Sequence, residues 1–366
     1  GSDHRLERRV AHAYRILIGR HRTSRQALSG RRSTFTRRQT VRPTAQRPHA
    51  PIPMGSSTLL EPQVMTAVQR AAVKTLLYFD VFHYPLRADE IRRFIGLRVG
   101  QEELLEELSG LEEEGIIQRA DDHYGFGDLA NNIARRRADN ARAEKRMRKA
   151  RRMSRFIGRF PFVRGVMLSG SMSKGCLAKD GDVDYFVITE PGRLWIARTL
   201  LIAFKKLFLL NSRKDFCVNY FLDLDHLAIE DRNLFTATEV LTLIPTFNAA
   251  VCDRFFAANL WAGNVLPNTE RHVASGIPHG DGFGKRSLEA LFRNGLGDEF
   301  DEWCMLRTLR HWRGKFAEFD RQQFDLALRT RKYVSKHHPR NFQQRVLDGH
   351  RARLERFAET HGAELR

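Results

Sequence analysis

Several features that would assign the chain to a class are missing from its 366 residues. It has only four cysteines, which are far apart and form no Cys-x-x-Cys pair, so neither a zinc knuckle nor a disulfide framework is indicated. The longest apolar run, 200–210, is interrupted by Lys205 and Lys206, so no transmembrane helix is predicted. The arginine-rich beginning has no long apolar stretch typical of a secretory signal. A reducing cytoplasmic location is therefore the simplest expectation.

The net charge of +19 is unevenly distributed. Residues 1–53 contain 13 arginines, no lysine and only two acidic residues, Asp3 and Glu7, and so carry +11, while the other 313 residues carry +8. This part is rich in Ser, Thr, Pro and Gln, which predicts a disordered basic segment over 1–57. Two interpretations stay open: a nucleic-acid-binding tail, or residues that precede a natural start at Met54. The total charge therefore does not assign a function.

The stretch 58–128 has the pattern of a small winged-helix module. The spacing of apolar residues and the turn residues between them predict three helices and a β-hairpin. In chain order, the expected elements are helices over 62–82, 89–95 and 101–114, and a hairpin over 116–126. The third helix carries seven glutamates and no basic residue, so DNA phosphates would repel it. The module is expected to serve packing or partner binding, and binding of duplex DNA is not expected.

A single basic linker helix is predicted over 129–158. Between Arg135 and Arg155 there are 11 Lys or Arg residues against two acidic ones, a net charge of +9. A narrow apolar stripe along it would pack on one side. The cationic side is either a surface for RNA, phosphate or an acidic acceptor, or a solvated connecting helix, because a run of charge alone specifies no partner.

The clearest chemical pattern begins with an apolar strand over 163–168. It leads into a tight turn at Gly170-Ser171 and a short helix over 171–177. Such a turn places backbone N–H groups and a hydroxyl at the beginning of a helix, where they can bind phosphate. The sequence therefore predicts a phosphate-binding turn at this point.

A second strand is predicted over 182–189, and two aspartates lie at its beginning. Asp182 and Asp184 are two residues apart, so both carboxylates project from the same face. Two carboxylates held close together repel each other unless a cation lies between them. Mg²⁺, completed by substrate phosphates, is the cation that such oxygen ligands favour.

In this segment the chain resembles the DNA polymerase β-type nucleotidyltransferase superfamily. The resemblance rests on an apolar strand, a Gly-Ser turn, a ten-residue gap and Asp-apolar-Asp-apolar, and covers about 163–225. It implies that Gly170 and Ser171 bind the phosphates of a nucleoside triphosphate, and that Asp182 and Asp184 hold Mg²⁺ or Mn²⁺. The order of winged helix, core and helical tail also resembles bacterial and archaeal predicted nucleotidyltransferases.

The resemblance implies further residues of the site. Ser173 and Lys174 match the connecting helix, as candidate phosphate contacts. A third carboxylate on a neighbouring strand would complete the metal site and help to activate the acceptor hydroxyl. Asp223 and Asp225 follow the next apolar strand and share parity, so either could serve, and Asp223 is favoured as the metal ligand because it lies nearer the regular strand. The alternative is that both only cap the end of that strand.

The tail is predicted to be helical and is rich in arginine and aromatic residues. The sequence Ser-Lys-His-His-Pro over 335–339 is interpreted as a helix end at Pro339 rather than a metal site. Lys332 and Lys336 are four residues apart and would lie on one helical face, where they could contact a phosphate.

These inferences combine into one expectation. The fold would be α+β, with a nucleotidyltransferase-type mixed sheet flanked by helices. Its expected parts are the basic segment 1–57, the winged-helix module 58–128, the linker helix 129–158, the nucleotidyltransferase core 159–232 and the helical C-terminal domain 233–366. The chain would move a nucleoside monophosphate from an NTP to an acceptor hydroxyl of RNA, protein or a small molecule, releasing pyrophosphate. Alternatives are a catalytically weak nucleotide-binding regulator and a nucleic-acid-binding protein using the basic helix.

Overall fold

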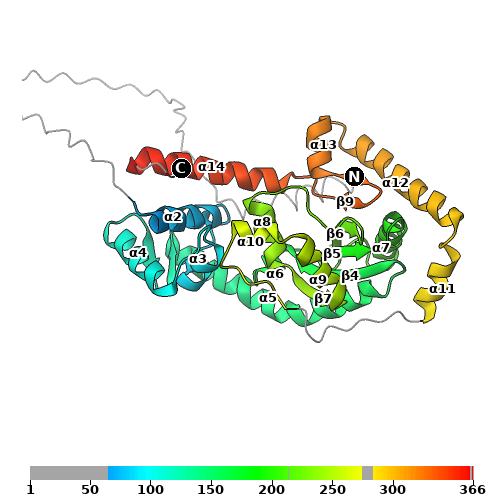
Figure 1. Ribbon diagram of the computed structural model, residues 1–366, viewed down its shortest axis with the longest axis horizontal. Coiled ribbons are helices and arrows are strands. Elements are labelled where there is room, and N and C mark those ends of the chain that lie inside the picture. The colour runs from blue at the N-terminus through cyan, green and yellow to red at the C-terminus, as the bar shows by residue number, and fades with distance from the viewer. Residues whose placement is uncertain (1–64, 213, 274–282, 363–364, 366) are drawn as a thin grey trace, which may run out of the picture. The chain divides into compact units, whose positions relative to one another are not determined.

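The computed structural model describes residues 65–212, 214–273, 283–362 and 365 (Figure 1). The predicted disordered segment 1–57 lies outside these residues. The described part of the chain contains helices together with one three-stranded and one mixed six-stranded sheet. The predicted α+β class with a mixed sheet is therefore confirmed. None of the helices described is both long and apolar enough to cross a membrane.

Three helices and a small antiparallel sheet form the first part of the described chain. They are α2 (Ala67–Asp80), β1 (Leu86–Arg87), α3 (Ala88–Phe94), α4 (Gln101–Glu113), β2 (Gln118–Ala120) and β3 (His123–Gly125). The sheet has the order β1-β3-β2. A capping box begins α2, because the Thr66 hydroxyl accepts from the Gln69 N–H and the Gln69 side chain accepts from the Thr66 N–H. Helices and hairpin therefore lie at the positions that the apolar spacing predicts.

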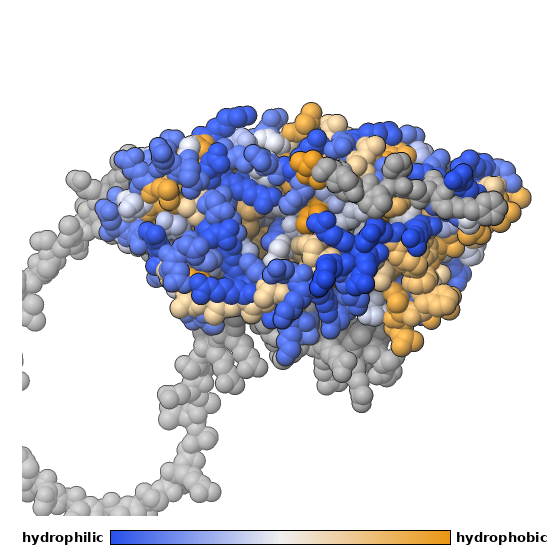
Figure 2. Space-filling view, turned by 90° about the horizontal axis from the view of Figure 1, so that it is seen from below, coloured by the Kyte–Doolittle hydropathy of each residue, from blue (hydrophilic) through white to orange (hydrophobic). Residues whose placement is uncertain are grey.

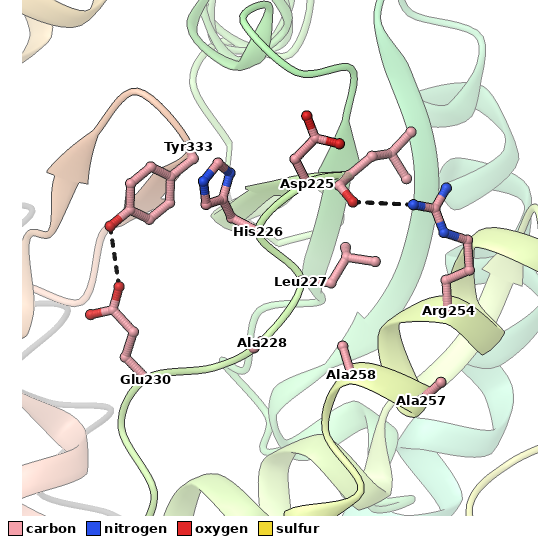
Figure 3. A pocket seen from close by; sticks show the side chains of 10 residues that line it. Asp225, His226, Leu227, Ala228, Glu230, Arg254, Ala257, Ala258 and Tyr333 are labelled. Atoms are coloured by element: carbon pink, nitrogen blue, oxygen red, sulfur yellow. Dashed lines mark hydrogen bonds between the residues drawn. The ribbon is translucent and has the colours of Figure 1, made fainter.

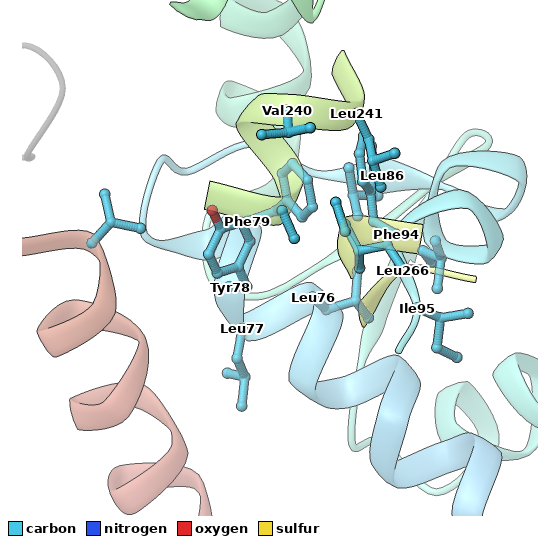
Figure 4. Close-up of a cluster of buried hydrophobic side chains, with 14 of the residues drawn as sticks. Leu76, Leu77, Tyr78, Phe79, Leu86, Phe94, Ile95, Val240, Leu241 and Leu266 are labelled. Carbon is cyan, nitrogen blue, oxygen red and sulfur yellow. The ribbon is translucent and has the colours of Figure 1, made fainter. Parts of the chain in front are cut away.

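The core of this first part continues into later helices (Figure 4). Leu76 and Phe79 of α2 belong to one buried cluster with Val240 and Leu241 of α8 (Leu234–Thr242). The C-terminal helix α14 (Phe342–His361) also contacts α2, where Arg353 pairs with Asp80 at 2.6 Å. Burial of large apolar side chains is the main stabilising term in folding. The first part therefore packs on later helices of the chain through a shared hydrophobic core.

The helix α5 (Leu129–Gly158) spans the range over which the sequence predicts one basic helix. Its buried side packs through Ala143, Ala150 and Ile157. Five exposed cations on its other sides make no ion pair with any residue that the structure describes: Lys145, Arg148, Arg151, Arg152 and Arg155. Figure 2 looks onto this side of the molecule, where hydrophilic side chains cover most of the surface and hydrophobic ones gather at one end.

The six-stranded sheet has the strand order β7-β4-β5-β6-β9-β8. Its strands are β4 (Val163–Ser169), β5 (Asp184–Thr189), β6 (Cys217–Asp223), β7 (Ile244–Phe247), β8 (Thr330–Arg331) and β9 (Val334–Lys336). Strands β5 and β6 are parallel and are connected through α7 (Leu194–Phe208), while all other pairs are antiparallel. A connection between parallel strands needs about a dozen residues or more, and α7 provides them.

The predicted boundary between the core 159–232 and a helical domain 233–366 is wrong, because the sheet crosses it. Strand β7 pairs with β4, and β9 pairs with β6, so both edges of the sheet come from the C-terminal region. These strands have two to four residues, too few for an alternating pattern to show in the sequence. The helices of this region are α8, α14, α9 (Ala249–Ala258), α10 (Trp261–Val265), α11 (Phe283–Leu291), α12 (Gly295–Lys315) and α13 (Arg321–Ala327).

The predicted helix ending at Pro339 is also wrong. Residues 334–336 form the strand β9, so Lys332 and Lys336 share no helical face. Lys336 is buried and pairs with Asp231 at 3.0 Å, while the exposed Lys332 pairs with Glu302 at 3.2 Å. Both lysines therefore serve ion pairs within the fold.

Candidate functional site

The turn after β4 and the beginning of β5 lie side by side. In the antiparallel pair β4–β5, Ser169 is opposite Asp184. Gly170 follows with φ of +66°, and a Cβ placed on it would lie 2.5 Å from Oδ2 of Asp184. Only glycine combines this backbone conformation with so close an approach. The Gly-Ser turn and the second aspartate of the predicted pair therefore meet as one site.

The Asp184 carboxylate is surrounded by more negative than positive charge. Burial raises its pKa to about 7; a hydrogen bond with the Cys217 side chain opposes this rise, nearby Asp182 and Glu239 add to it, and Lys174 opposes it. The Asn219 amide donates to Oδ1 of Asp184 at 2.9 Å. A cation bound between Asp182 and Asp184 would relieve this repulsion.

The helix after the turn, α6 (Gly170–Ser173), is shorter than the predicted 171–177. The buried Ser173 hydroxyl donates to the Gly170 carbonyl at 2.9 Å. The Lys174 ammonium donates to the same carbonyl at 3.0 Å and pairs with Glu239 of α8 at 2.7 Å. Ser171 is exposed at the surface. Of the predicted phosphate contacts, Ser173 and Lys174 thus stabilise the turn from inside.

Neither Asp223 nor Asp225 can complete a metal site with Asp182 and Asp184. In the parallel pair β5–β6, Asp184 is level with Cys217, whereas Asp223 is level with Thr189. The five-residue distance along the strand is about 17 Å at the usual rise per residue. Asp223 is buried there, and its Oδ1 accepts the backbone N–H groups of Asp225 and His226 at 3.1 and 3.0 Å. The prediction of a third ligand at these positions is therefore wrong.

Sequence reasoning missed two residues of the site, Asn219 and Glu239. A strand–helix–strand order is typical of parallel strands, and it would have placed the beginning of β6, including Asn219, beside Asp184. Glu239 comes from a helix about fifty residues further along the chain, and no local pattern marks it. Its position depends on how α8 packs against the rest of the fold.

The residues present fit a magnesium ion shared with a phosphate-bearing substrate. Within the described ranges, no three His, Cys, Asp or Glu side chains are close enough to form a metal site by themselves. Mg²⁺, however, is usually held by one or two carboxylates together with substrate phosphates and water. Asp182 and Asp184 provide that number, and the charge imbalance at Asp184 favours a cation there.

Other proteins give no independent guide to this site. A scan against family models, a search of curated proteins and a search of solved structures each find no match to this chain.

Proposed function

We propose that the chain is a Mg²⁺-dependent nucleotidyltransferase that moves a nucleoside monophosphate from an NTP to an acceptor hydroxyl. The observation that carries the proposal is the close approach of Gly170 to Asp184, which brings the Gly-Ser turn and the second aspartate of the pair together. Turn and aspartates are the two parts that the resemblance implies for phosphate and metal. The sheet around them is consistent with a core of that type.

Each residue has a specific role in this proposal. Asp182 and Asp184 would hold Mg²⁺ or Mn²⁺, which neutralises charge on the attacking and leaving oxygens in an in-line displacement. Gly170 and the exposed Ser171 would contact the β- and γ-phosphates.

Glu239 is the group that we place as the base for the acceptor hydroxyl, in the role that the resemblance implies for Asp223 or Asp225. It is near enough to Asp184 to add to the rise in its pKa, and it is held by Lys174. A triphosphate at the turn would attract the Lys174 ammonium and free the Glu239 carboxylate to take a proton. The variant Glu239→Gln should then keep nucleotide binding but lose transfer.

Thermal unfolding of the full chain tests nucleotide binding. Mg²⁺ and an NTP together should raise Tm more than either does alone, because each completes the other's contacts. Asp182→Asn and Asp184→Asn should each lose this joint effect. Asp180→Asn removes the same charge from an exposed residue two positions earlier and should keep it. If both site variants retain the joint effect, the proposal fails.

Transfer itself is measured with a panel of α-labelled NTPs, Mg²⁺ and fractionated lysate, by asking which fraction gains label. A second candidate function, nucleotide binding with little transfer, is favoured by one observation: an amide, Asn219, contacts Asp184 where the parallel register places the beginning of β6. Asn219→Asp distinguishes the two functions. If transfer is slow because a third metal ligand is missing, the added carboxylate should increase it; if the chain already transfers efficiently, the rate should not rise.

For the first part of the chain, we propose that α2, α3, α4 and the small sheet form a winged-helix module used for packing. Its core is shared with α8, and glutamates cover the exposed side of α4. A mobility-shift titration of the full chain with duplex DNA should show no binding that depends on this module. If DNA is retarded, Arg148→Gln and Arg152→Gln in α5 show where it binds. Retardation that they weaken would agree with binding at α5, whereas retardation that they leave unchanged would point to the module and contradict the proposal.

A further inference from the structure

A second candidate site lies at the opposite end of the sheet, beyond the carboxyl ends of β5 and β6 (Figure 3). It is a surface depression of about 520 Å³. The loop after β6, the helix α9 and the turn before β9 contribute its lining residues, which are Leu224, Asp225, His226, Leu227, Ala228, Glu230, Arg254, Ala257, Ala258 and Tyr333. Strands β5 and β6 are the one parallel pair in the described six-stranded sheet, and in open α/β sheets ligands bind outside the carboxyl ends of parallel strands. The volume of the depression lies in the range of small-molecule sites, and its position is one at which such sites occur.

A buried carboxylate fixes the histidine of this depression. Oδ1 of Asp223 lies 2.8 Å from Nδ1 of His226, and the Asp223 side chain is 5% exposed whereas that of His226 is 50% exposed. Because the carboxylate accepts a hydrogen from Nδ1, the neutral ring carries its proton there and presents the lone pair of Nε2. Nε2 has no hydrogen-bond partner among the residues that the structure describes.

The plane of the same ring is fixed by an aromatic neighbour. Tyr333 stacks on His226 with ring centroids 4.1 Å apart and an angle of 18° between planes. The Tyr333 hydroxyl in turn donates to Glu230 at 3.3 Å and accepts from Arg331 at 3.0 Å. The imidazole is therefore oriented by a hydrogen bond on one nitrogen and by stacking on one face, which leaves the other nitrogen for a ligand.

A cation lies on the far side of the same depression. Arg254 of α9 is exposed and donates to the Leu224 carbonyl at 3.4 Å, and its remaining N–H groups have no partner within the described ranges (Figure 3). Leu227, Ala257 and Ala258 form the apolar surface near it. A ligand there would meet the positive charge of Arg254 at one end and a hydrogen-bond acceptor at the other. The lining also contains two carboxylates: Glu230 pairs with Arg331 at 3.2 Å, whereas the exposed Asp225 would weaken the binding of an anion.

We propose that this depression binds a small organic anion that also carries a hydroxyl group. Arg254 holds the anionic group, a phosphate or a carboxylate, through charge-assisted hydrogen bonds. Nε2 of His226 accepts the hydrogen of the hydroxyl, and the apolar wall contacts the carbon chain between the two. The site is separate from Asp182 and Asp184, since the two lie at opposite ends of β5, and it needs neither metal nor NTP.

The test follows His226 in the full chain by nitrogen-15 NMR of the imidazole groups, without Mg²⁺ or NTP. Comparison with His226→Gln assigns the resonance. The probes are glycerol 3-phosphate and glycerate, which have both groups, together with glycerol, which has only hydroxyls, and methyl phosphate, which has only the anion. We expect a saturable shift of the Nε2 resonance with glycerol 3-phosphate, glycerate or both, and these two distinguish a phosphate from a carboxylate ligand.

Variants then show whether the two ends of the depression act together. Arg254→Gln should weaken the binding of the effective probe about tenfold, the usual value of one charged hydrogen bond. The control Arg271→Gln removes an exposed arginine that pairs with Asp253 and does not line the depression, so it should bind normally. The proposal is overturned if neither anionic probe shifts Nε2, if glycerol alone gives the same shift, or if Arg254→Gln binds as well as the parent chain.

Discussion

The parallel strands β5 and β6 have two aspartates at each end: Asp182 and Asp184 at the Asp184 end, and Asp223 and Asp225 at the Asp223 end. The two pairs differ in the groups that surround them. At the beginning of β5, Asp184 receives hydrogen bonds from Asn219 and Cys217, while Asp182 and Glu239 repel it, and its pKa rises to about 7. At the far end, one oxygen of Asp223 accepts two backbone N–H groups and contacts the His226 ring. A carboxylate with other carboxylates beside it favours a cation, whereas one that accepts several N–H groups can act by orienting its partner.

Each end of the strand pair also has a histidine, and the two histidines differ in their burial and in their charged neighbours. His338 lies at the Asp184 end, because the neighbouring His337 donates its backbone N–H to Asn219. Burial, and to a smaller extent the charge of Lys336, lower the pKa of His338 to about 4. His226, at the other end, is half-exposed and contacts a carboxylate. Burial at the Asp184 end therefore disfavours positive charge on His338.

The largest effect is expected from Gly170→Ala, which would break the Asp184 end. The left-handed conformation costs an alanine about 1–2 kcal/mol, and the contact of its Cβ with Asp184 adds to this, so we expect a loss of about 3 kcal/mol in the free energy of unfolding. Gly175→Ala is the matched control, because Gly175 has φ of +68° with nothing within 4 Å of a Cβ, and it should lose only the backbone part. Equal losses in denaturant titrations of the two variants would contradict the close approach to Asp184.

The next effect concerns acid stability at the same end. The folded pKa of His338 is below its unfolded value of about 6.5, so the unfolded chain binds more protons between about pH 6.5 and 4, and stability falls as the pH falls through that range. We expect His338 to contribute a loss of about 2 kcal/mol between pH 7 and 4.5. His338→Gln should be less stable than the parent at pH 7 and should show a shallower fall, measured as the difference between the two pH profiles. Parallel profiles would contradict a buried neutral His338.

The Asp223 end is tested by Asp223→Asn. The amide cannot match the carboxylate as an acceptor for Nδ1 of His226 and for two backbone N–H groups, so we expect a loss of about 1–2 kcal/mol in stability. The imidazole NMR pattern of His226 should also lose its preference for the Nδ1–H form. Asp225→Asn, at an exposed position, should change neither. Both variants should keep the joint Tm increase with Mg²⁺ and NTP, and its loss in Asp223→Asn alone would unite the two ends in one site.

The two ends also differ in how much of each the sequence predicts. Strand β4, Gly170 and Asp184 lie within about twenty residues, and the resemblance of this segment implies that the turn and the aspartate meet. The pattern predicts the wrong position for Asp223, because parity gives the face of a strand and not its direction relative to a neighbour. That direction follows from the α7 crossover, a signal that the sequence contains.

Other parts of the fold depend on packing over long distances in the chain. The strands β7, β8 and β9 are too short to show a period, and the sequence around β9 predicts the end of a helix instead. Glu239 reaches the site only through the packing of α8, which also joins the hydrophobic cluster of the first helices. By contrast, α2, α4 and α5 each carry several turns of apolar spacing, so the sequence predicts them well.

The smallest effect should come from Tyr333→Phe, which separates the two ways in which His226 is held. This variant keeps the ring that stacks on His226 and removes only the hydroxyl that contacts Glu230 and Arg331 at the surface. Since exposed polar contacts contribute little, we expect a change below about 0.5 kcal/mol in stability and an unchanged His226 NMR pattern. Tyr333→Ala removes the stacking as well and should broaden or shift the His226 resonances while the hydrogen bond to Asp223 remains. If Tyr333→Phe alone disturbs His226, the orientation of the imidazole depends on the network of Glu230 and Arg331 rather than on the buried carboxylate and the aromatic face.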